Sequence, residues 1–424
     1  MVTPFGIATI LVALVALAGW VNAKTARIAP GVAMLIAGLV GALLLGIAGS
    51  SHVEAARQAI AAVNRIDFSA AVTQYMLGFL LFAGAMQVNM EEARRLWAPI
   101  GILASLGVIA TTVIVGVGVY LAARLVSVPL PLTWALVFGA LISPTDPLAV
   151  LATLKHGNLS GRLKVILQAE ALLNDGVGIV VFLALLAIAA GGEHASPAQP
   201  VIAVLVQSIG GLAFGLFAAF LVIRAMRPLD DFAVETAMTV ALAMVAYAGA
   251  QALSLSGAIS VVGAGMLFGS ESGQQSISGQ TEGYVRAFWT LVDEILNALL
   301  FLMLGIELLV VRVHLGELSL ILAAIILVLV ARMLVVLPWG VFYRARRSER
   351  GAVAILTWGG LHGALSVALA LSIPASNERN LLLSLTYAVV AFSIVVQGLS
   401  FGPFAKRLTR PQRDQSRPKT SVLR

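Results

Sequence analysis

Long apolar segments recur along the whole chain and constrain its fold more than any other feature. A helix needs about 20 apolar residues to cross the hydrocarbon core of a membrane. Only 11% of the 424 residues are charged, against about 25% in a soluble domain, so the chain cannot cover a normal water-facing surface. We therefore predict an all-α polytopic membrane protein with about 13 transmembrane helices, at 4–21, 31–49, 70–88, 99–123, 132–154, 165–190, 201–223, 233–253, 257–269, 288–311, 318–341, 352–373 and 381–402.

The distribution of basic residues predicts the orientation of these helices. Most of the 27 lysine and arginine residues fall in alternate loops between the predicted spans or in the last twenty residues. Cytoplasmic loops are the basic ones in membrane proteins. We therefore expect a multi-pass protein of the cytoplasmic membrane with its N-terminus outside and its C-terminus inside. Residues 405–424 would form a basic cytoplasmic tail close to anionic lipid.

Several classes of site are excluded by composition. The chain has no cysteine, and its five histidines are scattered along the sequence, so neither a thiolate site nor a zinc site is expected. We expect no cofactor. The net charge of +7 lies at the edges of apolar segments and in the tail, so it indicates the membrane surface rather than nucleic acid.

The predicted spans indicate an internal repeat. Thirteen helices can be divided into spans 1–6 and 8–13, with one extra helix between the halves. Proline and glycine interrupt the fifth span, 132–154, and the twelfth, 352–373. These two spans occupy the same position in their respective halves. Transporters built from inverted repeats bind their substrate at a pair of broken helices near the bilayer midplane. The sequence thus predicts inverted repeats with two broken crossing helices.

Ionisable residues inside the spans are few, and each needs a reason because insertion costs about 2.5–3.5 kcal/mol or more. Four of them fall near the ends of predicted spans, where contact with water explains them: Glu235, Asp293, Glu294 and Glu307. Asp146, Asp175 and Arg332 are central in their spans, which favours a functional role.

Asp146 lies in the sequence Ser143-Pro144-Thr145-Asp146-Pro147. Two prolines three residues apart interrupt a helix, and unwound backbone at membrane depth survives only inside protein or beside a cavity. We expect Asp146 to cap the half-helix that follows it and to balance its dipole. A simple kink and an ion-handling site are both compatible with the pattern.

Asp175 lies five residues after Glu170, so the two carboxylates point to different faces of one helix and do not form a hydrolytic pair. A single buried carboxylate beside the Asn174 amide can hold either a proton or a small cation, because burial disfavours its charged form. The alternative is a carboxylate that only joins helices. Arg332 requires a buried acid, and Glu170 is the first choice, whether or not that pair takes part in transport.

At these residues the chain resembles the NhaP-like monovalent cation:proton antiporters. The resemblance rests on Ser143–Pro147, on 170–180 with its Asn174-Asp175 pair, on Phe288–Glu307, and on the glycine-rich sequence 358–366. These stretches follow one another from the fifth predicted span to the twelfth, so the resemblance covers essentially the whole membrane region.

The resemblance implies a transporter and not an enzyme. It would exchange Na⁺ (or Li⁺) for H⁺ in pH homeostasis and form a homodimer. Residues 1–404 would form the antiporter domain, with an interface part (about 1–98 and 201–311) and a moving core part (about 99–190 and 318–404). The resemblance implies that Asp175 binds the cation or the proton and that Asn174 is its neutral neighbour. Thr145 would offer a backbone oxygen, and Asp146 would supply a charge where the two broken helices cross. Glu170 and Arg332 would form a structural ion pair.

Three positions depart from the family pattern. Ala171 stands where many relatives have serine, and Ala83 stands where many have an acid. Both changes remove oxygen ligands, so K⁺/H⁺ exchange remains an alternative to Na⁺/H⁺ exchange. His362 replaces an arginine and is a candidate pH sensor, since histidine titrates near neutrality, although the pattern favours a merely hydrogen-bonded histidine. A gated channel is disfavoured because no ring of carbonyls or acids is evident.

Overall fold

The structure is a computed structural model that describes 4–25, 28–50, 72, 76–88, 91, 95–146, 161–191, 198–279, 281–307, 315–343 and 351–409. Its named elements are all helices, as the all-α prediction requires. Seven of the described helices are long and apolar enough to cross a membrane, and five more apolar helices are shorter. Each of the thirteen predicted segments overlaps at least one described helix. The number of spans stays a prediction.

The longer helices follow the apolar segments closely. They are α1 (Pro4–Lys24), α2 (Pro30–Ser50), α5 (Leu77–Met86), α7 (Trp97–Ala104), α8 (Leu106–Leu125), α9 (Leu132–Ile142), α11 (Gly161–Ala190), α12 (Ala198–Met226), α13 (Phe232–Met244), α15 (Gly257–Phe268), α17 (Thr281–Glu307), α18 (Leu318–Tyr343), α19 (Ala352–Trp358), α20 (Ala364–Leu371), α21 (Arg379–Phe392) and α22 (Gly398–Thr409). Short helices complete the chain: α14 (Ala250–Ala252), α16 (Glu271–Gln274), the 3₁₀ turn η3 (Leu315–Glu317), and the π-helical turns η2 (Val245–Gly249) and η4 (Ser393–Gln397).

The two interrupted segments are broken helices. The helix α9 ends at Ile142, two residues before the first proline of the interrupting motif, and the chain is non-helical from Ser143 to Asp146. The half-helices α19 and α20 are separated by the non-helical backbone of 359–363. The two unwound stretches meet in an isolated antiparallel bridge between Asp146 and Leu361. The rest of the fifth predicted span, 147–154, lies outside the described residues.

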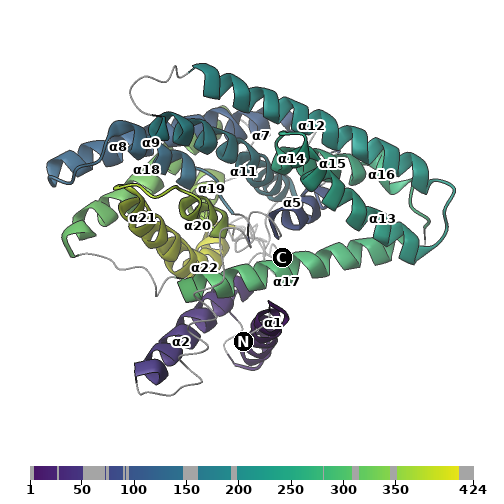
Figure 1. Cartoon of the computed structure of the whole chain (residues 1–424), viewed down its shortest axis with the longest axis horizontal. Coiled ribbons are helices and arrows are strands. Elements are labelled where there is room, and N and C mark those ends of the chain that lie inside the picture. The colour runs from purple at the N-terminus through teal and green to yellow at the C-terminus, as the bar shows by residue number, and fades with distance from the viewer. Residues whose placement is uncertain are drawn as a thin grey trace, which may run out of the picture.

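The helices pack into two neighbouring groups (Figure 1). In one group α2 packs against α17, while α15 packs against both α5 and α12. In the other group α8 packs against α9 and α18, and α20 packs against α21. The long helix α11 contacts members of both groups, since it packs on α7 and α9 and also on α12 and α15. It therefore carries its side chains to the boundary between the groups.

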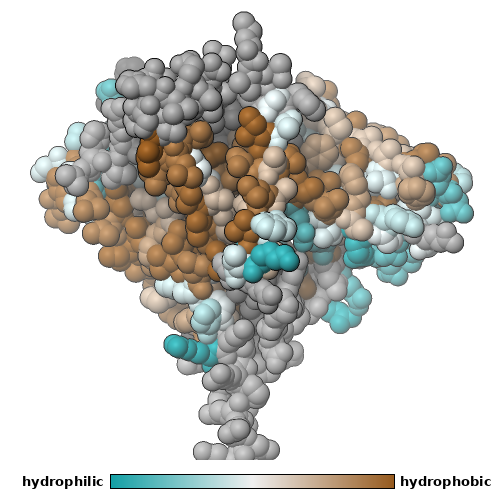
Figure 2. Space-filling model, turned by 90° about the horizontal axis from the view of Figure 1, so that it is seen from below, coloured by the Kyte–Doolittle hydropathy of each residue, from teal (hydrophilic) through white to brown (hydrophobic). Residues whose placement is uncertain are grey.

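The outer surface of the described residues is widely apolar. Figure 2 shows a broad hydrophobic face with hydrophilic residues gathered toward its edges. Large side chains such as Trp97 and Leu125 are 75% and 86% exposed on their helices. Such a surface exceeds the apolar patches of water-soluble monomers and suits contact with lipid.

The start of α17 corrects one expectation. The apolar segment begins at 288, but the helix begins at Thr281. Its polar first turns are helical because the carbonyl oxygen of Ser278 accepts hydrogen bonds from Thr281 and Glu282, and Glu282 pairs with Arg286 at 2.9 Å. Asp293 and its neighbour therefore lie midway along this longer helix, and their position near the end of a membrane span stays a prediction.

Candidate functional site

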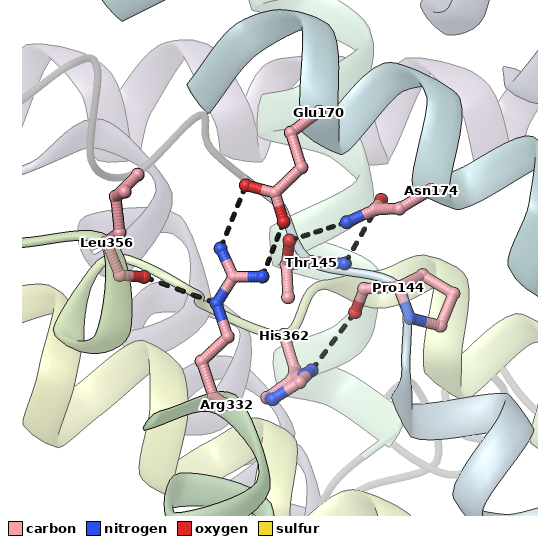
Figure 3. A network of polar contacts seen from close by, with 7 residues as sticks. All are labelled: Pro144, Thr145, Glu170, Asn174, Arg332, Leu356 and His362. Carbon is pink, nitrogen blue, oxygen red and sulfur yellow. Dashed lines mark hydrogen bonds and ion pairs between the residues drawn. The ribbon is translucent and has the colours of Figure 1, made fainter. Parts of the chain in front are cut away.

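The two broken helices are joined where their unwound segments cross. The backbone N–H of Asp146 donates a hydrogen bond of 2.6 Å to the carbonyl oxygen of Leu361. His362 adds a second link, because its Nδ1 lies 3.1 Å from the carbonyl oxygen of Pro144 (Figure 3). A carbonyl oxygen can only accept, so Nδ1 carries the proton of this bond. The histidine is buried and ties the crossing together.

Asn174 holds the unwound segment from the side of α11. Its Nδ2 donates a hydrogen bond of 2.8 Å to Thr145 Oγ1, and its Oδ1 accepts from the backbone N–H of Thr145 at 3.4 Å (Figure 3). Both residues are buried. The amide thus satisfies a side chain and a backbone group that the break in the helix leaves without helical partners.

Asp175 follows Asn174 on α11, and about 100° of helical rotation separates their side chains. It is partly exposed and lies within electrostatic reach of Asp146. Gly178 accounts for the close approach of α11 to the crossing, because a Cβ atom at this position would clash with the ring of Pro144. Asp175 consequently lies where both groups of helices and the unwound backbone converge.

Asp146 lies at the N-terminus of the half-helix α20. A Cβ atom added at the N-cap Gly363 would come within 2.6 Å of Asp146 Oδ2 and 2.9 Å of its Cβ, so only glycine permits this approach. The carboxylate faces the positive end of the α20 dipole, a favourable position for an anion. The predicted cap was for the half-helix after Pro147, which is outside the described residues; the partner seen here belongs to the other broken helix.

Glu170 and Arg332 form a two-pronged ion pair that connects α11 with α18. Arg332 Nη1 binds Glu170 Oε1, and Nη2 donates to Oε2 at 3.0 Å. The exposed fractions of the two residues are 1% and 7%. The remaining guanidinium nitrogen, Nε, donates at 3.2 Å to the carbonyl oxygen of Leu356 near the C-terminus of α19 (Figure 3). This cation thus also faces the negative end of a half-helix.

The positions that depart from the family pattern add no ligands. Ala171 and Ala83 are buried and present only methyl groups. Among the described residues no group of three or more histidine, cysteine, aspartate or glutamate side chains could hold a metal ion.

Two supporting residues on η4 were not found by reading the sequence. Ser393 Oγ accepts a hydrogen bond of 2.9 Å from the backbone N–H of His362. Gln397 Nε2 donates at 3.3 Å to the carbonyl oxygen of Trp358. A π-helical turn redirects side chains relative to an α-helix, and no residue pattern in this apolar segment marks such a turn.

Comparisons with known proteins agree with this geometry. The family described as sodium/hydrogen exchanger, transmembrane, matches residues 10–407. The chain is 39% identical over 405 residues to the Na⁺/H⁺ antiporter NhaP of Pseudomonas aeruginosa, which covers 94% of this chain and 95% of that protein. It is 32% identical over 392 residues to the Na⁺/H⁺ antiporter NhaH of Halobacillus dabanensis, covering 91% and 93%.

The fold is also that of a solved relative. The chain superposes on the sodium proton antiporter MjNhaP1 of Methanocaldococcus jannaschii with a TM-score of 0.73, over 96% of this chain and 99% of the other, at 17% identity. With broken helices that cross, a buried ion pair beside them and a family match over nearly its whole length, this chain belongs to the sodium/hydrogen exchanger family of multi-pass membrane transporters.

Proposed function

We propose that the protein is a secondary antiporter that exchanges Na⁺ (or Li⁺) for H⁺ across the cytoplasmic membrane. The single observation that carries the proposal is the placement of Asp175 next to the crossing, with Asn174 fixing the unwound backbone beside it. A carboxylate in this place binds a proton or a cation, and only one of them at a time. The relatives named Na⁺/H⁺ antiporters support this substrate pair.

The mechanism follows from competition at one carboxylate. In the empty ionised form, Asp175 attracts a cation, and the carbonyl oxygens of the unwound segments together with Thr145 complete its oxygen shell. When a proton binds instead, the carboxylate is neutral and the cation is released. Asp146 and the Arg332–Glu170 pair balance the ends of the half-helices, so the crossing keeps its shape in both forms.

The same proposal includes exchange of one cation for one proton without net charge movement. Asn174 has no proton to give, and Glu170 is bound on both oxygens by the Arg332 guanidinium. Asp175 is then the one group that exchanges its proton, and one proton replaces one monovalent cation.

Alternating access requires one helix group to move against the other. We propose that the core part (about 99–190 and 318–404) moves relative to an interface part (about 1–98 and 201–311). The packing of α8 on both α9 and α18, and of α2 on α17, supports this division. The proposal includes a homodimer formed through the interface part, with the N-terminus outside and the C-terminus in the cytoplasm.

Proton flux in everted membrane vesicles tests the proposal directly. A pH gradient is established, and Na⁺, Li⁺ or K⁺ is added in turn. We expect Na⁺ and Li⁺ to collapse the gradient with the wild-type protein. With Asp175→Asn, no cation should do so, although the protein inserts normally. A response to K⁺ alone would favour K⁺/H⁺ exchange, which the missing oxygens at Ala171 and Ala83 allow. Substantial exchange by folded Asp175→Asn would refute the single-carboxylate mechanism.

A further inference from the structure

The helical segment that follows each broken helix holds the unwound backbone in the same way. After the first break, Asn174 Oδ1 on α11 accepts a hydrogen bond from the backbone N–H of Thr145, 29 residues earlier. After the second break, Ser393 Oγ on η4 accepts one from the backbone N–H of His362, 31 residues earlier. These two segments belong to the sixth and thirteenth predicted spans, which occupy the same position in the two halves of the predicted repeat. Ser393 is thus the counterpart of Asn174.

The second break is held from η4 on both of its sides. His362 precedes Gly363, the N-cap of α20, so its backbone N–H lies outside the hydrogen bonds of that half-helix. Trp358 is the last residue of α19, and the last carbonyl oxygens of a helix have no partner within it. Ser393 satisfies the first of these groups, and Gln397 Nε2 donates to the second at 3.3 Å. Both side chains are buried.

The π-helical turn η4 is built from these two side chains. It begins at Ser393 and ends at Gln397, and it interrupts an otherwise α-helical segment made of α21 and α22. A π-helical turn inside an α-helix is rare and occurs mostly at functional sites. Here the turn places two polar side chains on the unwound backbone of the neighbouring span.

Ser393 also fixes the residue that links the two breaks. Its hydroxyl holds the backbone of His362, and the ring Nδ1 of the same residue is hydrogen-bonded to the carbonyl oxygen of Pro144 at 3.1 Å (Figure 3). The preceding residue, Leu361, accepts the hydrogen bond of 2.6 Å from the backbone N–H of Asp146. A shift of the backbone at Ser393 would therefore be passed through one residue to both unwound segments.

We propose that Ser393 is a positioning residue for cation binding. Its hydroxyl keeps the second unwound segment in the place that the cation site requires, as Asn174 does for the first. The inference rests on the proposed antiport function, in which oxygens of the unwound segments complete the shell of the bound cation. Ser393 acts through His362 and is not itself a ligand. Partners that orient metal ligands from outside typically change the affinity 10–100-fold when they are removed.

Na⁺-driven proton flux in proteoliposomes, measured against Na⁺ concentration, tests the assignment. Ser393→Ala should raise the apparent KM for Na⁺ about tenfold. A role confined to folding would reduce the amount of active protein, and with it the maximal rate, but would leave KM unchanged. Ser393→Thr keeps the hydroxyl acceptor and should bring KM back to within about threefold of wild type.

Thr386→Val is the matched control. It removes another buried hydroxyl from the same predicted span, but that hydroxyl donates at 2.7 Å to the carbonyl oxygen of Leu382 in its own helix. Its KM should equal that of wild type. An unchanged KM in Ser393→Ala, an equal rise in the control, or a KM in Ser393→Thr as high as in Ser393→Ala would overturn the inference.

A second variant covers the case in which Ser393→Ala does not fold. Ser393→Cys retains a small side chain with only a weak acceptor, so it should show a similar rise in KM. If neither variant folds while Ser393→Thr does, Ser393 is structural and the inference is overturned. A wild-type protein without Na⁺-driven flux would instead refute the proposed function.

Discussion

Loss of the buried carboxylate at position 170 should strongly destabilise the protein. Glu170→Gln leaves the Arg332 guanidinium, which is 7% exposed, without its anionic partner. Breaking a buried ion pair from one side costs about 3–5 kcal/mol. The insertion cost of about 2.5–3.5 kcal/mol for an arginine at the centre of a spanning helix is of the same size. We therefore expect a loss of about 3 kcal/mol or more.

Removal of both charges should cost much less. The double variant Glu170→Leu with Arg332→Met replaces the pair by apolar side chains, a change that is often close to neutral. It forfeits the hydrogen bond from Nε to the carbonyl oxygen of Leu356, which is worth about 1 kcal/mol. The single variants Glu170→Leu and Arg332→Met each leave one buried charge unpaired, so their losses together should exceed that of the double variant by several kcal/mol, as expected for contacting residues in a double-mutant cycle.

Thermal unfolding of the purified protein in detergent, followed by the midpoint of the transition, measures these differences. Glu282→Gln is the control because it removes the acid of an exposed pair with Arg286, and such pairs contribute at most about 1 kcal/mol. The midpoint of this control should stay close to that of wild type. Additive effects of the two single changes at the buried pair would refute the reasoning, because they would mean that Glu170 and Arg332 contribute independently.

Three further predictions concern transport. His362→Gln retains a donor for the carbonyl oxygen of Pro144 but cannot titrate, so flux should persist with an unchanged pH profile between about pH 6 and 9; a shifted profile would identify the histidine as a pH sensor. Gly363→Val should abolish flux, because its Cβ would lie 2.6 Å from Asp146 Oδ2; wild-type flux would show that the crossing tolerates displacement of this carboxylate. Clamped membrane potentials should leave the exchange rate unchanged; voltage dependence would imply a second proton carrier, because each net charge couples to about 2.3 kcal/mol per 100 mV.

The fold was largely predictable because two physical constraints act on it. One is the apolar length that a helix needs to cross a membrane, and the other is the interruption of helices by proline and glycine. Apolar length alone located a helix in each of the thirteen segments. The proline pair around Asp146 marked the end of α9 at Ile142. The glycines of the twelfth segment predicted a break, and the structure has one at 359–363. Helix boundaries were predicted less well, since polar turns such as the start of α17 extend a helix beyond its apolar part.

The binding partner of a site residue could be predicted where few residue types can satisfy that residue. It could not be predicted where the three-dimensional arrangement of the helices decides among several possible partners. A buried arginine demands an acid, and Glu170 is the acid that the structure places against Arg332. Asp146 could have capped any nearby half-helix, and only the crossing of the two segments puts it on α20. Neither apolar length nor charge counting carries that information. The buried carboxylates of this chain are therefore found by sequence, whereas the group that each one faces has to come from the packing of the helices that carry them.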